Sequence, residues 1–531
     1  MKEKEFNLLE EPWIRVRRPD CTIGEVSLTD ALLGAHAYAG LAGELPTQDV
    51  AVLRLLLAVL HTVVCRYDPQ GRESPLRDED DALERWKVLW ERGRLPQEPI
   101  LDYLSRWRER FWLFHPERPF YQVAALQNGI EFSAAKLNGE ISQGENKPRL
   151  FVSYAGEEKD RLSYAQAARW LLYINGYDEK GGRPKPGNPP RKGVGWLGQI
   201  GFIAFQGVTL FETLMRNLIL LEDGEKLCGE PTPCWEDAEV DATPSCKIGR
   251  LDNQARLLTM QSRRILLERD PQTSFVTGFS LLGGDYIDTE EISPFIEQYT
   301  LWKKGKETGN RPIQFLPRVH EGSKQLWREF PALFREREPG VIKWNTALIN
   351  AGIIPGDHMA SLVAVSNVYY PKQESKVIDT YADSLSFHME VINSLGNAKG
   401  KVILEVNGCE KVAERVGRLA RDIDEAAGGS GNGAAEAARE RFYFAIDRPF
   451  RQWLYELDPE QDVDGAVLAW RKQAAALARR TGRALVEEAG PAALVGRAVK
   501  EGTEQAYLAA PKAFNRFLKE LSDYEKGRYA T

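Results

Sequence analysis

Four long segments with helical periodicity follow one another after about residue 380, and they constrain the fold more than any other feature of this sequence. In each segment apolar residues recur at spacings of three and four, over runs rich in alanine, which is typical of amphipathic helices. GGSGNG (428–433), DPEQDVDG (458–465) and Gly490-Pro491 separate the segments. Because long helices joined by short turns pack antiparallel, residues 381–531 are predicted to form an all-α four-helix bundle.

The first 380 residues carry a mixed pattern. FNLLEEPWIRVR (6–17) ends in the alternation of a half-buried strand, and a helix is predicted from Pro46, with Thr47 as its cap. Strand patterns then alternate with helical ones, and strands are predicted at 255–267 and 273–282. A chain of 531 residues exceeds the roughly 250–300 at which one core stops growing. We therefore expect an α+β fold, with a large mixed α/β domain over 1–380 and the bundle over 381–531.

Neither export nor a membrane span is predicted. The N-terminus lacks an apolar signal core, and the longest apolar stretch (53–64) contains Arg54 and His61. That stretch is shorter than the ~18–20 residues that a bilayer requires. Six scattered cysteines do not form a disulfide framework, which favours a reducing compartment. We expect a cytoplasmic protein that has no membrane partner and is monomeric when isolated.

A basic loop stands out in this acidic chain. KGGRPKPGNPPRKGVG (180–195) holds five basic residues and no acid, whereas the whole chain has a net charge of −7. Overall repulsion from phosphate means that any nucleic-acid contact must use such focused patches. Glycines let the backbone approach a phosphate closely, and the prolines stiffen the loop. On these residues alone, nucleic-acid contact and a solvated surface loop are equally supported.

Known catalytic and metal motifs are not found. The basic loop does not match GxxxxGK[ST], and GVGWLG (193–198) has the bare GxGxxG spacing without a clear following helix. Cys228, Cys234 and Cys246 lack the spacing of a metal knuckle, and the six histidines form no HExxH motif. An enzyme, nuclease-like or nucleotide-dependent, stays as the alternative, with acidic residues converging from distant segments.

Six short segments spread over the chain are informative together. They are FNLLEEPWIRVR (6–17), GELPTQDVAVLRLLLAVLH (43–61), HPERPFYQ (115–122), GVTLFETLMRNL (207–218), LLTMQSRRILL (257–267) and VYYPKQESKVID (368–379). By their order along the chain they resemble the CasA family, the large subunit of the type I-E CRISPR Cascade surveillance complex.

The resemblance implies a non-catalytic DNA-binding protein without a cofactor or metal. Such a subunit recognises the protospacer-adjacent motif (PAM) in double-stranded DNA and helps to destabilise the duplex, so that the guide RNA can form an R-loop. It also helps to recruit the helicase-nuclease that destroys the target. The implied partners are the other Cascade subunits with their guide RNA, the target duplex and the helicase-nuclease.

The resemblance also implies PAM-reading residues. A Phe-Val-Asn-like element of the family matches Phe151, Val152 and Ser153, where serine replaces the asparagine. The family's glycine loop follows one helix later and corresponds to the basic loop, with Gly181, Gly182 and Gly187 as candidates. The sequence does not say which glycine touches DNA or which PAM sequences are accepted. Phe151 and Val152 can also be read as an ordinary core strand.

A duplex wedge and phosphate contacts complete the implied site. Gln373 in YPKQESKVID matches a glutamine that is pushed between base pairs, and its alternative is an ordinary polar loop residue. The expected phosphate contacts are Lys180, Arg183, Lys185, Arg191, Lys192, Lys372 and Lys376. Some family members use a further mid-chain lysine. Since no Lys or Arg lies between Asp270 and Trp302, that contact is absent here or is supplied by Lys303, Lys304 or Lys306 from a shifted position. A scaffold without DNA contact is the third reading.

Overall fold

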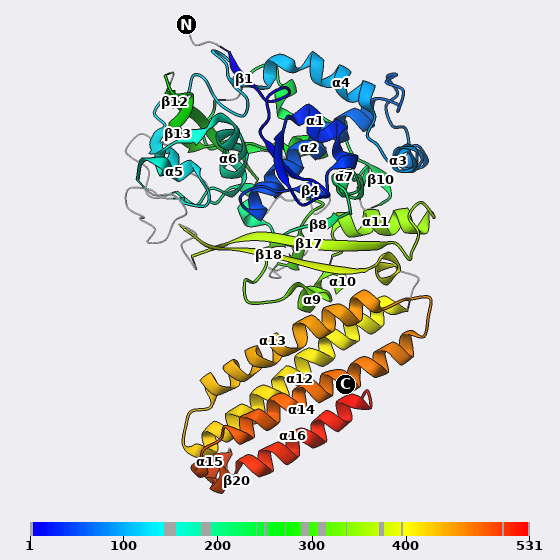
Figure 1. Cartoon of the computed structure of the whole chain (residues 1–531), viewed down its shortest axis with the longest axis vertical. Helices are drawn as coiled ribbons and strands as arrows, with labels where there is room; N and C mark the ends of the chain where they lie inside the picture. The colour runs from blue at the N-terminus through cyan, green and yellow to red at the C-terminus, as the bar shows by residue number, and fades with distance from the viewer. Residues whose placement is uncertain are drawn as a thin grey trace, which may run out of the picture. The chain divides into compact units, whose positions relative to one another are not determined.

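The computed structural model resolves into two compact units, which are described separately below. The N-terminal unit comprises Met1–Lys324, Leu333–Leu348 and Ser361–Ser384, and the helical unit comprises Gln325–Ala332, Ile349–Ala360 and Leu385–Thr531 (Figure 1). The residues that the structure describes are 4–142, 156–181, 193–222, 224–240, 242–248, 251, 253–270, 272–287, 297–305, 315–335, 337–370, 376–393, 397–501 and 504–528.

Helix α2 (Pro46–Arg66) is the central element of the N-terminal unit. It packs against α6 (Tyr164–Tyr177) and α8 (Gln254–Leu258). Among the described residues it is the one helix long and apolar enough to cross a membrane, but 89% of that apolar window is buried inside the fold. Its apolar sequence is therefore explained by burial in the core.

The start of α2 differs from the sequence prediction in one residue. Pro46 lies in the first turn as expected, but the cap is Leu45, which has extended backbone angles. Thr47 lies inside the helix and is fully buried, so its prediction as the cap was wrong. The reason is steric, because proline is favoured at the first helical position and places the cap one residue before itself.

The strands form several small sheets rather than one large one. The three largest have the orders β3-β2-β4, β12-β13-β6 (with β7 also paired to β13) and β18-β17-β8. Their strands are β2 (Ile14–Arg17), β3 (Ile23–Val26), β4 (Gly40–Leu41), β6 (Ile130–Ser133), β7 (Leu162–Ser163), β8 (Phe202–Gln206), β12 (Arg263–Asp270), β13 (Phe275–Gly283), β17 (Met359–Tyr369) and β18 (Val377–His388).

The remaining elements before the bundle are short. The two-stranded pairs are β1 (Glu5–Asn7) with β5 (Trp112–Phe114), β9 (Leu221–Glu222) with β10 (Lys226–Leu227), β11 (Lys247–Ile248) with β14 (Tyr286–Ile287), and β15 (Leu301–Lys304) with β16 (Phe315–Arg318). The helices are α1 (Leu28–Leu33), α3 (Glu79–Arg92), α4 (Gln97–Arg106), α5 (Ala134–Leu137), α7 (Leu210–Asn217), α9 (Leu326–Glu329), α10 (Ala332–Arg335) and α11 (Gly340–Asn350).

One predicted strand is half helix. The segment 255–267 divides into α8, whose cap Asn253 accepts a hydrogen bond from the backbone N–H of Arg256, and the strand β12. The alternation of apolar residues in 263–267 is that of a strand, but the preceding Ala255–Leu258 turn follows an Asn cap. The segment 273–282 is strand β13, as predicted.

The helical unit contains the predicted bundle (Figure 1). Its long helices are α12 (Ala398–Ala427), α13 (Asn432–Glu456), α14 (Val463–Glu487) and α16 (Ala510–Glu525). Their core includes stacked rings of Trp453 and Trp470, 5.4 Å apart, with Phe450 edge-on to both. The predicted α+β fold class, with a mixed N-terminal region and a C-terminal helical bundle, is confirmed.

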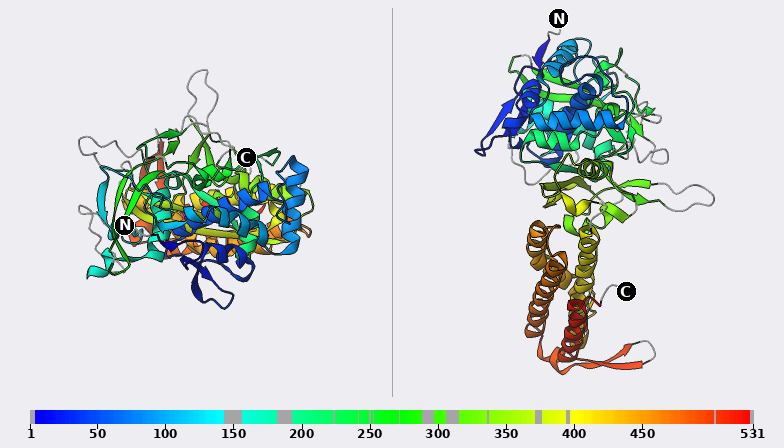
Figure 2. Two further views of the ribbon diagram at one scale, coloured as in Figure 1. Left: turned by 90° about the horizontal axis from the view of Figure 1, so that it is seen from above. Right: turned by 90° about the vertical axis from the view of Figure 1, so that its right-hand side faces the viewer.

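The fourth predicted helix of the bundle is interrupted. The segment from Pro491 onward forms the short helix α15 (Pro491–Val495), then a hairpin of β19 (Arg497–Glu501) and β20 (Glu504–Leu508), and only then α16. The hairpin lies at one end of the bundle (Figure 2). Gly496, with φ +80°, ends α15 in a backbone region that glycine favours. The prediction of one continuous helix was therefore wrong at this point.

Two arginines of α14 pair with neighbouring helices. Arg471 donates two hydrogen bonds to the buried carboxylate of Glu405, at 2.9 and 2.6 Å. Arg479 pairs with Glu525 at 2.6 Å. These side chains link α14 to α12 and α16.

Candidate nucleic-acid interface

Three of the predicted DNA-contacting residues lie in the described part of the chain. Lys180 is exposed, and Gly181 and Lys376 are half-buried. The remaining calls lie outside the described residues, and these are Phe151, Val152, Ser153, Gly182, Arg183, Lys185, Gly187, Arg191, Lys192, Lys372 and Gln373. Their segments, 143–155, 182–192 and 371–375, are called the first, second and third segment below. The described residues beside these segments show which side chains hold their ends.

The second segment follows α6. This helix begins with a capping box, in which the Ser163 hydroxyl accepts from the backbone N–H of Gln166, and the Gln166 side chain accepts from the backbone N–H of Ser163. Every residue of α6 except Gln166 is buried, and its C-cap is Asp178. The predicted order of one helix and then the basic loop is thus present, and the loop starts from a fixed helix end.

Four buried charged side chains and a serine gather where the segments begin. Lys136, Ser142, Asp178, Glu179 and Arg263 are each no more than 9% exposed, and they are called the loop base. The Lys136 ammonium donates to Glu179 Oε2 at 3.0 Å and lies 3.8 Å from Asp178 Oδ1. Arg263 Nε donates to Asp178 Oδ2 at 2.6 Å. Each buried charge therefore has an opposite partner, as burial requires.

Arg263 joins the two ends of the second segment. Its Nη2 donates to the backbone carbonyls of Asp178 and Glu179, both at 3.3 Å, and to that of Gly193 at 3.0 Å. The backbone N–H of Gly195 donates to the carbonyl of Asp178 at 2.9 Å. A Cβ on Gly195 would lie 2.3 Å from the carbonyl oxygen of Gly176. One guanidinium and a close backbone contact therefore hold together the two stretches of chain that flank residues 182–192.

The third segment ends beside the Glu179 carboxylate. The strands β17 and β18 flank it, and the Tyr370 N–H donates to the Lys376 carbonyl at 2.8 Å. The backbone N–H of Val377 donates to Glu179 Oε1 at 3.0 Å, and the Tyr369 hydroxyl donates to the Tyr177 carbonyl at 2.9 Å. Glu179 therefore links the end of the hairpin to the start of the basic loop.

The first segment follows Ser142, whose hydroxyl lies next to the Lys136 ammonium. After α5, the N–H groups of Ile141 and Ser142 both donate to the Asn138 carbonyl, at 3.1 and 2.6 Å. The Ser142 hydroxyl then accepts from Lys136 Nζ at 3.2 Å. Since the same ammonium binds Glu179, the starts of the first and second segments and the end of the third are joined through two side chains.

The loop base itself was not predicted. Asp178 and Glu179 directly precede KGGR in the sequence, and acids beside a basic loop are usually solvated. The available signal was their position at the end of a helix that is apolar on all sides, which is typical of a buried element. Lys136 and Arg263 gave no signal, because they are distant in sequence and meet the acids only in the fold.

Two alternatives from the sequence can be followed in the structure. GVGWLG leads into a 3-10 helix (Trp196–Gln199) and then strand β8, rather than into an α-helix that would open a dinucleotide site. Lys303 and Lys304 are exposed on β15, and Lys306 lies outside the described residues. Within the described ranges no group of three or more His, Cys, Asp and Glu is placed to hold a metal ion.

Comparison with known proteins gives the family. The model of the family described as CRISPR-associated protein Cse1 matches residues 7–481. A curated relative from Thermus thermophilus, the CRISPR-associated protein CasA/Cse1, is 26% identical over 98% of each chain. The crystal structure of Thermobifida fusca Cse1 is 29% identical, covers 98% of each chain and superposes with a TM-score of 0.83. A chain of a CRISPR RNA-guided surveillance complex, 20% identical, has the same fold with a TM-score of 0.70 over 98% of this chain and 100% of its own.

Proposed function

Because the chain belongs to the CRISPR-associated Cse1 family, we propose that it is the large, non-catalytic subunit of an RNA-guided surveillance complex. In this proposal it recognises the PAM in duplex DNA, helps to open the duplex for R-loop formation and helps to recruit the helicase-nuclease. Its partners are the other Cascade subunits with their guide RNA, the target DNA and that nuclease, all in the cytoplasm. The protein reads the short motif, and base pairing reads the rest of the target.

The observation that supports this function is that one end of each of the three segments lies at the loop base. The three stretches picked out by the family resemblance, around Phe151, Gly182 and Gln373, are far apart in sequence. Their ends nevertheless contact the linked pair of Lys136 and Glu179. A reading element, a glycine loop and a wedge must act on the same few base pairs. The proposed function therefore requires the three segments to be attached at one place in the fold.

Each segment has a distinct physical task in this proposal. Phe151 and Val152, with Ser153 in place of the family's asparagine, would face the PAM bases, and the glycines Gly181, Gly182 and Gly187 would let backbone approach the sugar edge. Gln373 would insert between two stacked base pairs. Unstacking them costs about a few kcal/mol, and contacts to the separated strands would offset this cost. The basic residues around them, including the exposed Lys180 and the half-buried Lys376, would hold phosphates in a salt-dependent manner.

The decisive experiment measures binding of the reconstituted complex to target duplexes with varied PAM sequences. We expect Gln373→Ala, or replacement of Gly181 and Gly182 by leucine, to relax PAM preference by about tenfold or more. Lys180→Gln should weaken all targets evenly and lower the slope of log affinity against log salt by about 1. Lys226→Gln is the matched control, because Lys226 is equally exposed but lies on β10.

Two results would contradict the proposal. If affinity and PAM preference both survive in the Gln373 and glycine variants, these residues do not read the duplex. If Lys226→Gln weakens binding as much as Lys180→Gln does, the basic loop contributes only general charge, and the scaffold reading becomes the better one.

A further inference from the structure

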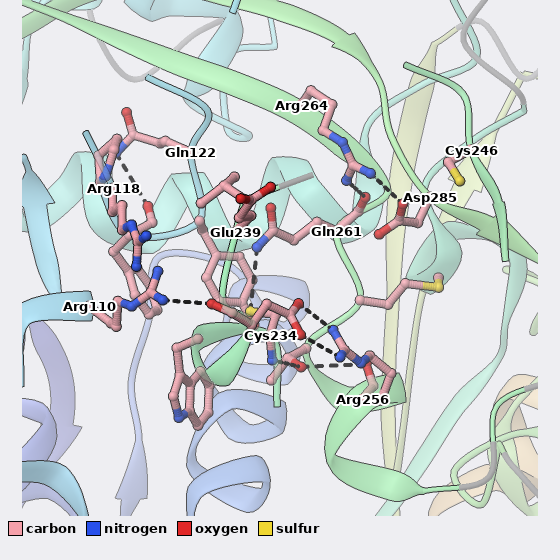
Figure 3. A pocket seen from close by; sticks show the side chains of 18 of the residues that line it. Arg110, Arg118, Gln122, Cys234, Glu239, Cys246, Arg256, Gln261, Arg264 and Asp285 are labelled. Atoms are coloured by element: carbon pink, nitrogen blue, oxygen red, sulfur yellow. Dashed lines mark hydrogen bonds and ion pairs between the residues drawn. The ribbon is translucent and has the colours of Figure 1, made fainter. Parts of the chain in front are cut away.

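A pocket in the N-terminal unit is lined by groups that the proposed function does not use. The pocket has a volume of about 380 Å³, within the range of roughly 300–1,000 Å³ that small-molecule sites occupy. Its walls come from the residues around Phe120, the turn at Cys234, helix α8 and the start of β12 (Figure 3). It is therefore a built cavity between secondary-structure elements of one unit.

The charges of the pocket are dominated by four arginines, two of which are already neutralised. Arg256 forms a bidentate pair with Asp237, with both hydrogen bonds at 2.6 Å. Arg264 pairs with Asp285 (Figure 3). Bidentate pairing with a carboxylate fixes a guanidinium in place and satisfies its charge. These two arginines therefore shape the wall and leave little charge for a ligand.

The other two arginines lack a carboxylate partner within the described residues. Arg110 donates only to the backbone carbonyl of Asp237, at 2.6 Å, and the structure gives the Arg118 guanidinium no hydrogen bond or ion pair there. Burial and the neighbouring charge of Arg118 both lower the pKa of Arg110. Figure 3 shows the two guanidinium groups next to each other on one side of the pocket. Two adjacent like charges repel, and an anion placed against them would relieve this repulsion.

Aromatic residues form the adjoining wall. Phe120, Tyr121 and Trp235 line the pocket and are at most 7% exposed. Tyr121 has a backbone φ of 55°, a region that a bulky residue rarely occupies and that often marks ligand sites. An aromatic wall beside guanidinium groups suits a ligand with a flat ring and an anionic end.

We infer that this pocket binds a phosphate ester of nucleotide size, with the phosphate held by Arg110 and Arg118 and the ring against the aromatic wall. A dianionic phosphate matches two adjacent guanidinium groups, whereas a single carboxylate would neutralise only one of them. The exposed carboxylate of Glu239 also lines the pocket, which disfavours a di- or triphosphate chain at the place of the single phosphate. Either a free nucleotide or the phosphorylated end of an oligonucleotide can supply this chemistry.

The pocket is separate from the loop base but is built on the same strand. Arg263 of the loop base and Arg264 of the pocket are consecutive residues of β12, and successive side chains of a strand point to opposite faces. Both are at most 2% exposed. Variants at Arg110 and Arg118 therefore test the pocket without removing any group of the loop base.

The test is calorimetric titration of the full chain with adenosine 5′-monophosphate, adenosine, inorganic phosphate and a 5′-phosphorylated dinucleotide. We expect the monophosphate to bind and adenosine not to bind at up to about 10 mM. The Arg110→Gln, Arg118→Gln double variant should weaken binding by about tenfold or more, and Arg118→Lys by less. Arg108→Gln is the matched control, because Arg108 lies two residues from Arg110 but pairs with Glu10 at 2.6 Å.

The outcomes separate the sources and can overturn the inference. Tighter binding of the dinucleotide than of the monophosphate would identify an oligonucleotide end as the ligand. Tighter binding of the monophosphate would identify a free nucleotide. Equal binding of adenosine and its monophosphate, unchanged binding by the double variant, or no binding of any probe would refute the phosphate site. Because Arg110 and Arg118 are both partly exposed, the variants are expected to fold, which a thermal melt of each would verify.

Discussion

The loop base of the N-terminal unit and the four-helix bundle of the helical unit place their charged side chains differently. At the loop base, Lys136, Asp178, Glu179 and Arg263 are all at least nine-tenths buried and bind one another across long sequence separations. Several ion pairs of the bundle are exposed, such as Arg441 with Glu488, whose side chains are 46% and 58% exposed. The difference teaches that the bundle is held mainly by its apolar core, whereas the loop base depends on completed charge pairing.

The largest expected effect comes from breaking that pairing. Arg263→Ala would leave Asp178 buried without its guanidinium partner, which destabilises a protein by about 3–5 kcal/mol. Arg441→Ala in the bundle should change stability by only about 0–1 kcal/mol, because its pair is solvated. Urea unfolding followed by circular dichroism measures both values. Similar losses in the two variants would show that the buried pairing does not distinguish the regions.

The regions should also differ in their response to pH. His320 is buried, stacks on Tyr381 and lies near Arg318 and Asp383, and burial lowers its pKa to about 4 from 6.5. Between these values the unfolded chain binds a proton that the folded chain does not, so stability falls as the pH is lowered. The shift corresponds to a loss on the order of 3 kcal/mol. The bundle helices contain no histidine, so this effect belongs to the N-terminal unit.

The check is the stability of the wild type and of His320→Asn between about pH 4 and pH 7. Other groups titrate there too, because burial lowers the pKa of His61 to about 4 and raises that of Asp49 to about 7. Asp49 acts in the opposite direction, since its folded form holds a proton that the unfolded chain loses. These groups are common to both proteins, so the variant should show the shallower loss. Parallel curves would mean that His320 is not the responsible group.

Glycine replacements give a smaller effect, of opposite sign in the two regions. A Cβ on Gly195 would meet the Gly176 carbonyl oxygen at 2.3 Å, so Gly195→Ala should destabilise by about 1–3 kcal/mol. Gly433 lies in the exposed first turn of α13 with nothing within 4 Å of the added carbon, so Gly433→Ala should stabilise by about 0.5–1 kcal/mol. Calorimetric melting of both variants measures the signs. A stabilising Gly195→Ala would show that the close approach can relax.

The bundle was largely predictable from the sequence because its signals are local. Spacings of three and four and the glycine breaks give α13 and α14 nearly to their ends, but they give α12 only from Lys411, whereas the helix begins at Ala398. The hairpin before α16 was missed, although Gly496 and Gly502 both interrupt the segment that was predicted as one helix. The strand half of 255–267 was found, but the Asn253 cap that starts α8 was overlooked.

The candidate interface was predictable only in part. The family resemblance selected the segments of Phe151, Gly181 and Gln373, and the structure shows what joins their ends. That junction depends on Lys136 and Arg263, which lie 43 and 84 positions from Glu179. No local pattern encodes a contact over such separations, and a buried Asp-Glu pair has the same letters as a solvated one.

The closure of the second segment by Arg263 bears on how such proteins can diversify. Because the chain on both sides of residues 182–192 is fixed by Gly193, Gly195 and Asp178, changes between those points need not disturb the core. Doubling a flexible loop's length costs only about 0.6 kcal/mol in closure entropy. The segment between these points can therefore change in length and composition as an exchangeable cassette, while the residues that hold its two ends stay unchanged.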